Sequence, residues 1–192
     1  MSPLKVLARW LEEERASGVK FPNGAVLGTV SSSGQVRTRM LGVHLDDEGR
    51  PRFHTTPGSR KVLDLEHNKR ASLTFAFQSS LRSVSLEGEI VALTEIELSS
   101  DWLSLDSTFR RSYLIFGATS GQPISSPSEL VSARQALPED AELSMPASFI
   151  GFRFHLVERV DFYVVGQGYF AEHTTHSYNN QNHTWSSQTV VP

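Results

Sequence analysis

An alternation of apolar and polar side chains in the middle of this chain fits a β-strand better than any other structure. Val84, Leu86 and Ile90 alternate with serine and glutamate residues, which is the period of two expected for a strand that buries one face. Similar alternation returns over residues 149–156 and 159–165 and predicts two further strands. The pattern predicts a mainly β fold with peripheral helices, an antiparallel barrel closed by C-terminal sequence, rather than a parallel α/β sheet.

Shorter segments add strands, turns and helix starts around this pattern. Residues 25–30 are typical of a buried strand that ends in a turn at 31–34, and 46–49 is a hairpin signal. Helix-start signals stand at four places: Ser2 followed by Pro3, Ser59, Thr94 with Glu97, and Ser126 with Glu129. Residues 138–146 are polar and aperiodic, which predicts an exposed loop.

Composition excludes several classes of function. The chain has 192 residues, of which 39% are hydrophobic, so we expect one sizeable core and a single domain over residues 1–192. A net charge of −3 gives no basic field for DNA or RNA, and the absence of cysteine excludes thiol catalysis, disulfides and cysteine-based zinc sites. No apolar signal core or membrane-length apolar run is visible, so we expect a cytoplasmic protein with no membrane partner.

The segment around Ser59 has the composition of an anion site. A predicted helix begins there with Ser59, Arg60 and Lys61, directly after a strand that contains residues 53–55. Backbone amides at a helix start are unpaired and partly positive, so these two cations, joined by Arg39 from an earlier strand, would hold a phosphate. The alternative is an ordinary helix start, because serine is a good N-cap whatever else it does.

The order of these segments resembles the pyridoxine/pyridoxamine 5'-phosphate oxidase family, whose members are FMN-binding split β-barrels. The resemblance covers nearly the whole chain and rests on collinear segments rather than on one decisive motif. These segments are residues 2–11, 25–34, 39–44, 58–61, 68–73, 86–88 and 185–192. The resemblance implies an FMN cofactor held between the two subunits of a homodimer, with two symmetric sites.

The resemblance also assigns side chains to the flavin. Those carried over from one subunit are Arg39, Met40, Leu41, His54, Thr55, Ser59, Arg60 and Lys61. Ser83, Gln122 and Tyr163 fall where the family lines the flavin, in part across the dimer. The family usually has glutamine at the place of Ser83 and tryptophan at that of Tyr163, so a long amide is lost while an aromatic ring is kept. Ordinary core packing is the alternative for Met40 and Tyr163.

The positions that would hold a substrate phosphate differ from the family pattern. His44 replaces a lysine, and residues 169–173 replace an Arg-Leu-His-Asp-Arg signature. The family's Tyr, Arg and Ser become Leu105, Phe109 and Tyr113. Loss of these cations predicts a non-phosphorylated aromatic or polycyclic substrate, as in relatives that oxidise dihydrophenazines. The residues expected to line the pocket are Leu105, Phe109, Tyr113, Tyr169 and Phe170. One alternative is a register shift that places Arg110 or Arg111 in the pocket. The other is that Phe109 and Tyr113 only pack the helix on the barrel.

The implied reaction needs few protein side chains. Substrate would deliver hydride to flavin N5, and dioxygen would reoxidise the flavin to give hydrogen peroxide. His44 and His173 are the candidate acid–base residues, because imidazole exchanges protons near neutral pH. A metal site at His173 and His176 is disfavoured, because the segment does not resemble a helix. Three alternatives stay open: a genuine pyridoxamine 5'-phosphate oxidase with an unusual phosphate site, a non-catalytic flavin- or ligand-binding protein, and a flavin or deazaflavin reductase.

Overall fold

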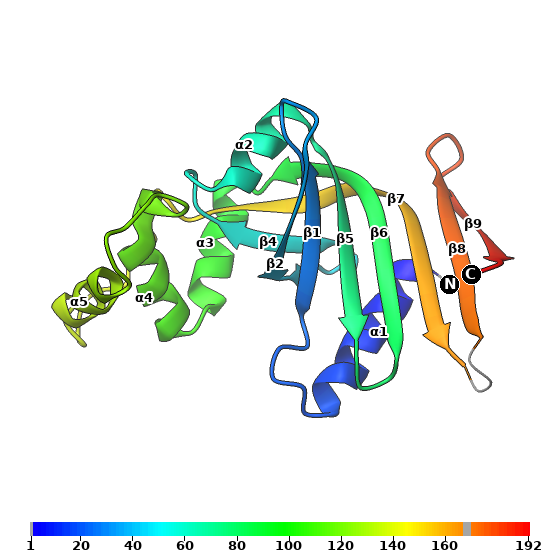
Figure 1. Ribbon diagram of the computed structural model, residues 1–192, viewed down its shortest axis with the longest axis horizontal. Coiled ribbons are helices and arrows are strands. Elements are labelled where there is room, and N and C mark those ends of the chain that lie inside the picture. The colour runs from blue at the N-terminus through cyan, green and yellow to red at the C-terminus, as the bar shows by residue number, and fades with distance from the viewer. Residues whose placement is uncertain (1, 167–169) are drawn as a thin grey trace.

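The computed structural model describes residues 2–166 and 170–192, where the chain forms one antiparallel sheet curled into a half-barrel with helices around it (Figure 1). The strands are β1 (Gly24–Val30), β2 (Val36–Gly42), β3 (His44–Leu45), β4 (Pro51–Thr55), β5 (Arg70–Phe77), β6 (Arg82–Ala92), β7 (Ile150–Val165), β8 (Ala171–Asn179) and β9 (Thr184–Val190). The helices are α1 (Pro3–Ala16), α2 (Arg60–His67), α3 (Glu95–Ser104), α4 (Ser107–Phe116), the 3-10 helix η1 (Gly117–Thr119) and α5 (Ser128–Ala136). The predicted mainly β fold with peripheral helices is confirmed.

The sheet divides at β7. Its strand order is β2-β1-β5-β6-β7-β4-β3, with β8 also paired to β7 and β9 to β8. One edge of β7 pairs with β6, while the other pairs first with β4 and later with β8. The prediction of two strands over 149–156 and 159–165 was wrong, because a single strand covers both. Opposite Glu87–Gly88 and Glu89–Ile90 of β6, β7 carries one extra residue each, and these bulges break its alternation without ending the pairing.

The core lies where α1 packs against one face of the sheet. Trp10 of α1 packs edge-on against Phe77 and Phe162, with ring centroids 6.1 and 5.1 Å apart. The fully enclosed strand residues beneath it include Leu27, Leu73, Phe75, Val84, Leu86, Phe154 and Val160. This buried apolar area supplies the main stabilisation of the sheet. The residues predicted on the buried face of β6 are thus confirmed as core.

The predicted helix starts agree with the structure, with one difference in detail. Thr94 and Glu97 form the predicted capping box at α3. At α5 the N-cap is Pro127, and Ser126 Oγ accepts a hydrogen bond from the Ser128 amide rather than closing a box. Residues 138–146 contain no helix or strand, as predicted for a loop.

One end of the molecule is helical and the other is formed by strands. Helices α3, α4 and α5 gather at one end, and the β8–β9 hairpin lies at the opposite end (Figure 1). Helix α2 lies beside β1 near the β1–β2 hairpin, at the upper edge of the view (Figure 1). Within the described ranges, no helix has the length and apolar character needed to cross a membrane.

Candidate functional site

The start of α2 is not capped by its own serine. Ser59 occupies the N-cap position with extended backbone, yet its hydroxyl makes no capping hydrogen bond. The hydroxyl lies 3.1 Å from that of Thr55 instead, and both residues are buried. Ser59 thus occupies the predicted N-cap position, but its side chain does not cap the helix. The first amides of α2 keep their partial positive charge and their capacity to donate to an anion.

Arg39 lies beside α2 in a buried polar cluster. Its Nη1 donates to Thr29 Oγ1 at 2.7 Å and to the Leu27 carbonyl at 3.2 Å, and its Nη2 lies 3.4 Å from Asp64 Oδ2. Asp64 is almost fully buried and also pairs with Arg37 at 2.8 Å. One carboxylate is thus shared between two arginines, and the cluster keeps an excess of positive charge. It also fixes the orientation of Arg39.

Lys61 adds a second cation at the same place. Burial, together with the smaller effect of the nearby charge of Arg39, lowers the pKa of Lys61 to about 8. Among the described residues no carboxylate pairs with Lys61 within 4.0 Å. Arg60 is exposed to solvent. Two mutually repelling cations beside uncapped amides are the arrangement expected of an anion site.

The segment that carries Gln122 reaches the start of α2. Gly121 has a φ of +85°, and a Cβ there would lie 3.5 Å from the Gly58 carbonyl oxygen. The amide of Gln122 donates to the Thr119 carbonyl in the turn after η1. The predicted flavin residue Gln122 is therefore close in space to the segment of Ser59, although 63 positions separate them in sequence.

A cavity of about 440 Å³ lies between β3, β4 and α4. Its lining residues are Lys20, Phe21, Asn23, Gly42, His44, His54, Ser104, Leu105, Asp106, Phe109 and Tyr113. The structure thus brings His44 together with Leu105, Phe109 and Tyr113, as predicted for a substrate pocket. A second cavity of about 310 Å³ shares His54, Phe109 and Tyr113 and continues to Thr55 and Ser120. Burial raises the pKa of Tyr113 to about 12, so its hydroxyl stays neutral.

A buried ion cluster supports this cavity and had no counterpart in the sequence analysis. His54 Nε2 lies 2.8 Å from Asp101 Oδ2, and Arg52 Nη2 lies 2.9 Å from the other carboxylate oxygen. The side chains of His54 and Asp101 are 7% and 5% exposed. Alternate residues of β4 place Arg52 and His54 on one face, but nothing in the sequence links them to a residue on α3 47 positions later.

Ser83, Tyr163 and His173 form a separate group on three neighbouring strands. Ser83 of β6 pairs with Tyr163 of β7, and Tyr163 pairs with His173 of β8. The rings of Tyr163 and His173 stack 4.0 Å apart, and His173 Nε2 lies 3.1 Å from Asp161 Oδ1. His173 is a buried strand residue and lines neither cavity beside His44. The two predicted acid–base residues are therefore not brought together within this chain.

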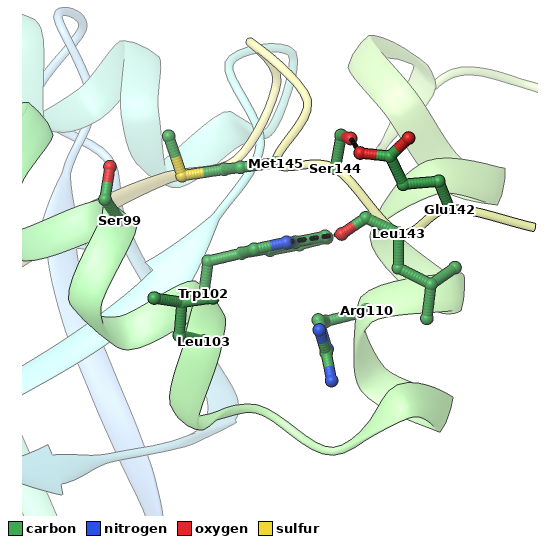
Figure 2. Close-up of a pocket in the computed structure, with 8 residues that line it drawn as sticks. All are labelled: Ser99, Trp102, Leu103, Arg110, Glu142, Leu143, Ser144 and Met145. Carbon is green, nitrogen blue, oxygen red and sulfur yellow. Dashed lines mark hydrogen bonds between the residues drawn. The ribbon is translucent and has the colours of Figure 1, made fainter.

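Arg110 and Arg111 do not enter the pocket of His44. Arg110 lines a different cavity of about 460 Å³ together with Trp102, whose indole N–H donates to the Leu143 carbonyl at 2.7 Å (Figure 2). Arg111 donates to the carbonyl oxygens of Pro138 and Glu139. Phe109 and Tyr113 lie on a different face of α4, so the register shift that would bring an arginine into the pocket does not occur.

The other predicted wall residues are not in the cavity. Phe170 is 83% exposed and lines neither cavity, so its predicted place in the wall was wrong within this chain. Tyr169, also predicted there, lies outside the described residues. Met40 is 65% exposed, which excludes the alternative that it is a core residue, while Leu41 is partly buried against the core.

Comparison with known proteins identifies a family and several related enzymes. The family model described as "Pyridoxamine 5'-phosphate oxidase" matches residues 11–113. The pyridoxine/pyridoxamine 5'-phosphate oxidase of Escherichia coli O157:H7 is 28% identical over 204 aligned positions, which cover 99% of this chain and 86% of that protein. The enzyme of the same name from Bordetella pertussis is 40% identical over 96 residues, which cover 50% of this chain and 46% of that protein. The match therefore spans about half the length of the Bordetella relative.

Two solved structures share the fold over the whole chain. PhzG from Burkholderia lata, solved with tetrahydrophenazine-1-carboxylic acid, has a TM-score of 0.86 at 20% identity over 100% of this chain and 93% of its own. An FMN-binding, pyridoxamine 5'-phosphate oxidase-related protein from Nostoc punctiforme has a TM-score of 0.82 at 18% identity. The alignment covers 100% of this chain and 98% of that protein. The fold is the split barrel of these proteins. Since the family model covers more than half of its length, this chain belongs to the pyridoxamine 5'-phosphate oxidase family.

Proposed function

We propose that this protein is an FMN-dependent oxidoreductase that acts on a non-phosphorylated aromatic or polycyclic substrate. The observation that carries the proposal is the uncapped start of α2, where Lys61 lies near Arg39, together with the aromatic cavity that Thr55 and Thr56 line just before this helix. FMN supplies hydride-transfer chemistry when bound, with reoxidation by dioxygen and release of hydrogen peroxide. The protein supplies binding, orientation and exclusion of water.

The residues at α2 fit the phosphate of FMN. The phosphate would accept hydrogen bonds from the first amides of α2 and pair with Lys61 and Arg39, while the hydroxyls of Thr55 and Ser59 offer further donors. Asp64, 3.4 Å from Arg39 Nη2, helps to hold Arg39 in place. The proximity of Gln122 to this point supports its proposed place beside the cofactor.

We further propose a homodimer in which the partner completes the flavin site. Ser83, Tyr163 and His173 form a stacked polar and aromatic surface that lines neither cavity of its own chain. A two-fold axis would place this surface against the cavity of the other subunit. In that arrangement the stacked ring of Tyr163 packs on the flavin, and His173 retains its proposed acid–base role.

The lining of the cavity supports a substrate without phosphate. Leu105, Phe109 and Tyr113 are apolar or aromatic, and the two arginines of α4 point elsewhere. Lys20 is the remaining strong cation of the lining, and Asp106 offsets it. Charge-assisted hydrogen bonds to a phosphate dianion contribute about 1.5–3 kcal/mol each, so a pocket with one cation binds such a ligand weakly.

A genuine pyridoxamine 5'-phosphate oxidase is the second candidate. The match to the E. coli O157:H7 enzyme over 99% of this chain favours it. Steady-state turnover of pyridoxine 5'-phosphate and of a non-phosphorylated dihydrophenazine, measured on the same preparation, separates the two proposals. A kcat/KM at least tenfold higher for the phosphorylated compound would reverse the order of the candidates.

FMN titration tests the cofactor assignment. We expect about one FMN per chain, with an affinity that falls at least tenfold in Lys61→Ala because one charge-assisted contact is lost. Lys5→Ala, on the exposed face of α1, serves as the matched control and should bind FMN like the wild type. Wild-type protein that takes up no FMN would refute the proposal.

A further inference from the structure

The imidazole of His54 is held from three sides. Its Nε2 lies 2.8 Å from Asp101 Oδ2, and its ring stacks on Phe149 with centroids 4.8 Å apart and planes at 24°. Its Cδ2 edge faces Gly151 of β7, where a Cβ atom would lie 3.1 Å from Cδ2. His54 therefore has one ring orientation rather than several.

The partners of Asp101 fix which ring nitrogen carries the proton. A carboxylate accepts hydrogen bonds and donates none, so Nε2 of His54 is the protonated nitrogen. Arg52 Nη2, 2.9 Å from Oδ1, holds the carboxylate from its other side. Burial lowers the pKa of His54, while the hydrogen bond to Asp101 opposes this shift. In the neutral ring, Nδ1 is consequently a hydrogen-bond acceptor.

The direction of Nδ1 follows from the sheet order. Nδ1 and Cδ2 lie on opposite sides of the ring, and β4 lies between β7 and β3. Since Cδ2 faces β7, Nδ1 faces β3 and His44, whose ring centroid is 5.9 Å away. Over residues 2–166 and 170–192 no group donates to Nδ1 of His54, and this atom is not among the enclosed polar atoms without a partner. It is therefore an unused acceptor on the wall of the cavities that His54 lines.

We propose that Nδ1 of His54 accepts a hydrogen bond from an N–H or O–H group of an aromatic ligand, and that Asp101 is the residue that positions it. This pairing selects rings that bear a hydrogen-bond donor over isosteric rings that lack one, because the unpaired acceptor would otherwise be desolvated. The inference rests on the proposed function only in taking this cavity as the substrate site. The charged or titratable groups around His54 are Asp101 from α3, Arg52 from β4, His44 from β3 and Tyr113 from α4.

The tautomer can be measured on the flavin-free protein. Two-dimensional ¹H–¹⁵N correlation of the histidine rings at pH 7.5 should show His54 as the Nε2-protonated tautomer. Asp101→Asn should change this ring pattern, because an amide can donate to the ring as well as accept. Asp47→Asn, an exposed residue of the β3–β4 turn, should leave it unchanged. A wild-type His54 protonated on Nδ1 would overturn the proposal without any variant.

Donor selection is tested with a matched pair of probes. We expect 2-naphthol to bind the flavin-free wild type about tenfold more tightly than 2-methoxynaphthalene, which corresponds to about 1.4 kcal/mol. Asp101→Asn should remove most of this preference, with unchanged far-UV circular dichroism as the check on folding, and Asp47→Asn should keep it. Equal affinity of the two probes for the wild type, or no binding of either up to their solubility limits, would overturn the inference.

These outcomes are separate from those of the proposed function. Loss of FMN binding in the titration above would refute the oxidoreductase assignment while the tautomer and probe preference stayed measurable. A wrong tautomer together with normal FMN uptake would refute only the role of His54 and Asp101.

Discussion

At the scale of single residues, Lys61 makes the cofactor site sensitive to pH. With a pKa of about 8, Lys61 is charged below this value and loses its charge as the pH rises through it. Because FMN is an anion, its affinity should be highest near pH 7 and should fall several-fold by pH 9. Fluorescence quenching of FMN measures this profile. Lys61→Ala should bind more weakly and show a flatter pH dependence, and an equally steep fall in that variant would assign the dependence to another group.

Asp64 is the residue whose loss should cost the most stability near the site. It accepts hydrogen bonds from Thr29 at 2.6 Å and from Arg37 at 2.8 Å while almost fully buried. Asp64→Asn leaves two arginines without their shared carboxylate, so urea unfolding should show a loss of about 3–5 kcal/mol. The exposed Asp47→Asn should change stability by no more than about 0.5 kcal/mol. Wild-type stability in Asp64→Asn would show that the cluster contributes nothing to folding.

At the scale of elements, the β6–β7 pairing depends on a glycine. A Cβ at Gly88 would overlap the Leu156 carbonyl oxygen, which is backbone and cannot move independently. Gly88→Ala should therefore destabilise the fold by about 1–3 kcal/mol in urea unfolding, as overpacking does. Gly42→Ala is the control, because its Cβ would meet Phe21 at an ordinary 3.5 Å. Equal stability of both variants would contradict the register described for this strand pair.

The elements that could be predicted are those with local signals. The capping box at Thr94 and the alternation around Leu86 are encoded within a few residues, so the sequence was sufficient. The continuity of β7 could not be predicted, because its alternation breaks where Glu158 and His155 of β7 are extra residues without a register partner on β6. The pairing of His54 with Asp101 depends on how α3 packs on β4. No pattern of neighbouring residues in the sequence predicts this packing.

At the scale of the whole molecule, the collinear order of segments predicted the family and the split-barrel fold, and both are confirmed. The cavity beside His44 was predicted in part, since Leu105, Phe109 and Tyr113 line it together with His44, while the buried His173 does not line it. A sequence cannot show which groups meet only across a subunit interface. The single-domain, homodimeric and FMN-bound states remain predictions.

The exposed outer face of the sheet provides a test of the dimer. Val26 of β1 and Met40 of β2 are register partners and are 42% and 65% exposed. We expect sedimentation velocity to show a dimer at micromolar concentration, and Met40→Asp to shift it toward monomer because a charge at an apolar contact is costly. Ile96→Asp, at an 84% exposed position of α3, should remain dimeric. A wild-type monomer at all concentrations would refute the proposed assembly.

The most direct test of the oxidoreductase proposal is anaerobic mixing of the FMN-loaded protein with 5,10-dihydrophenazine, followed at the visible flavin absorbance band. We predict bleaching of the band, recovery on admission of air, and one hydrogen peroxide per FMN reoxidised. Pyridoxine 5'-phosphate at the same concentration should bleach the band at least tenfold more slowly. A flavin band that neither compound bleaches would contradict the account and would leave a flavin-binding barrel without oxidase activity toward either class of substrate.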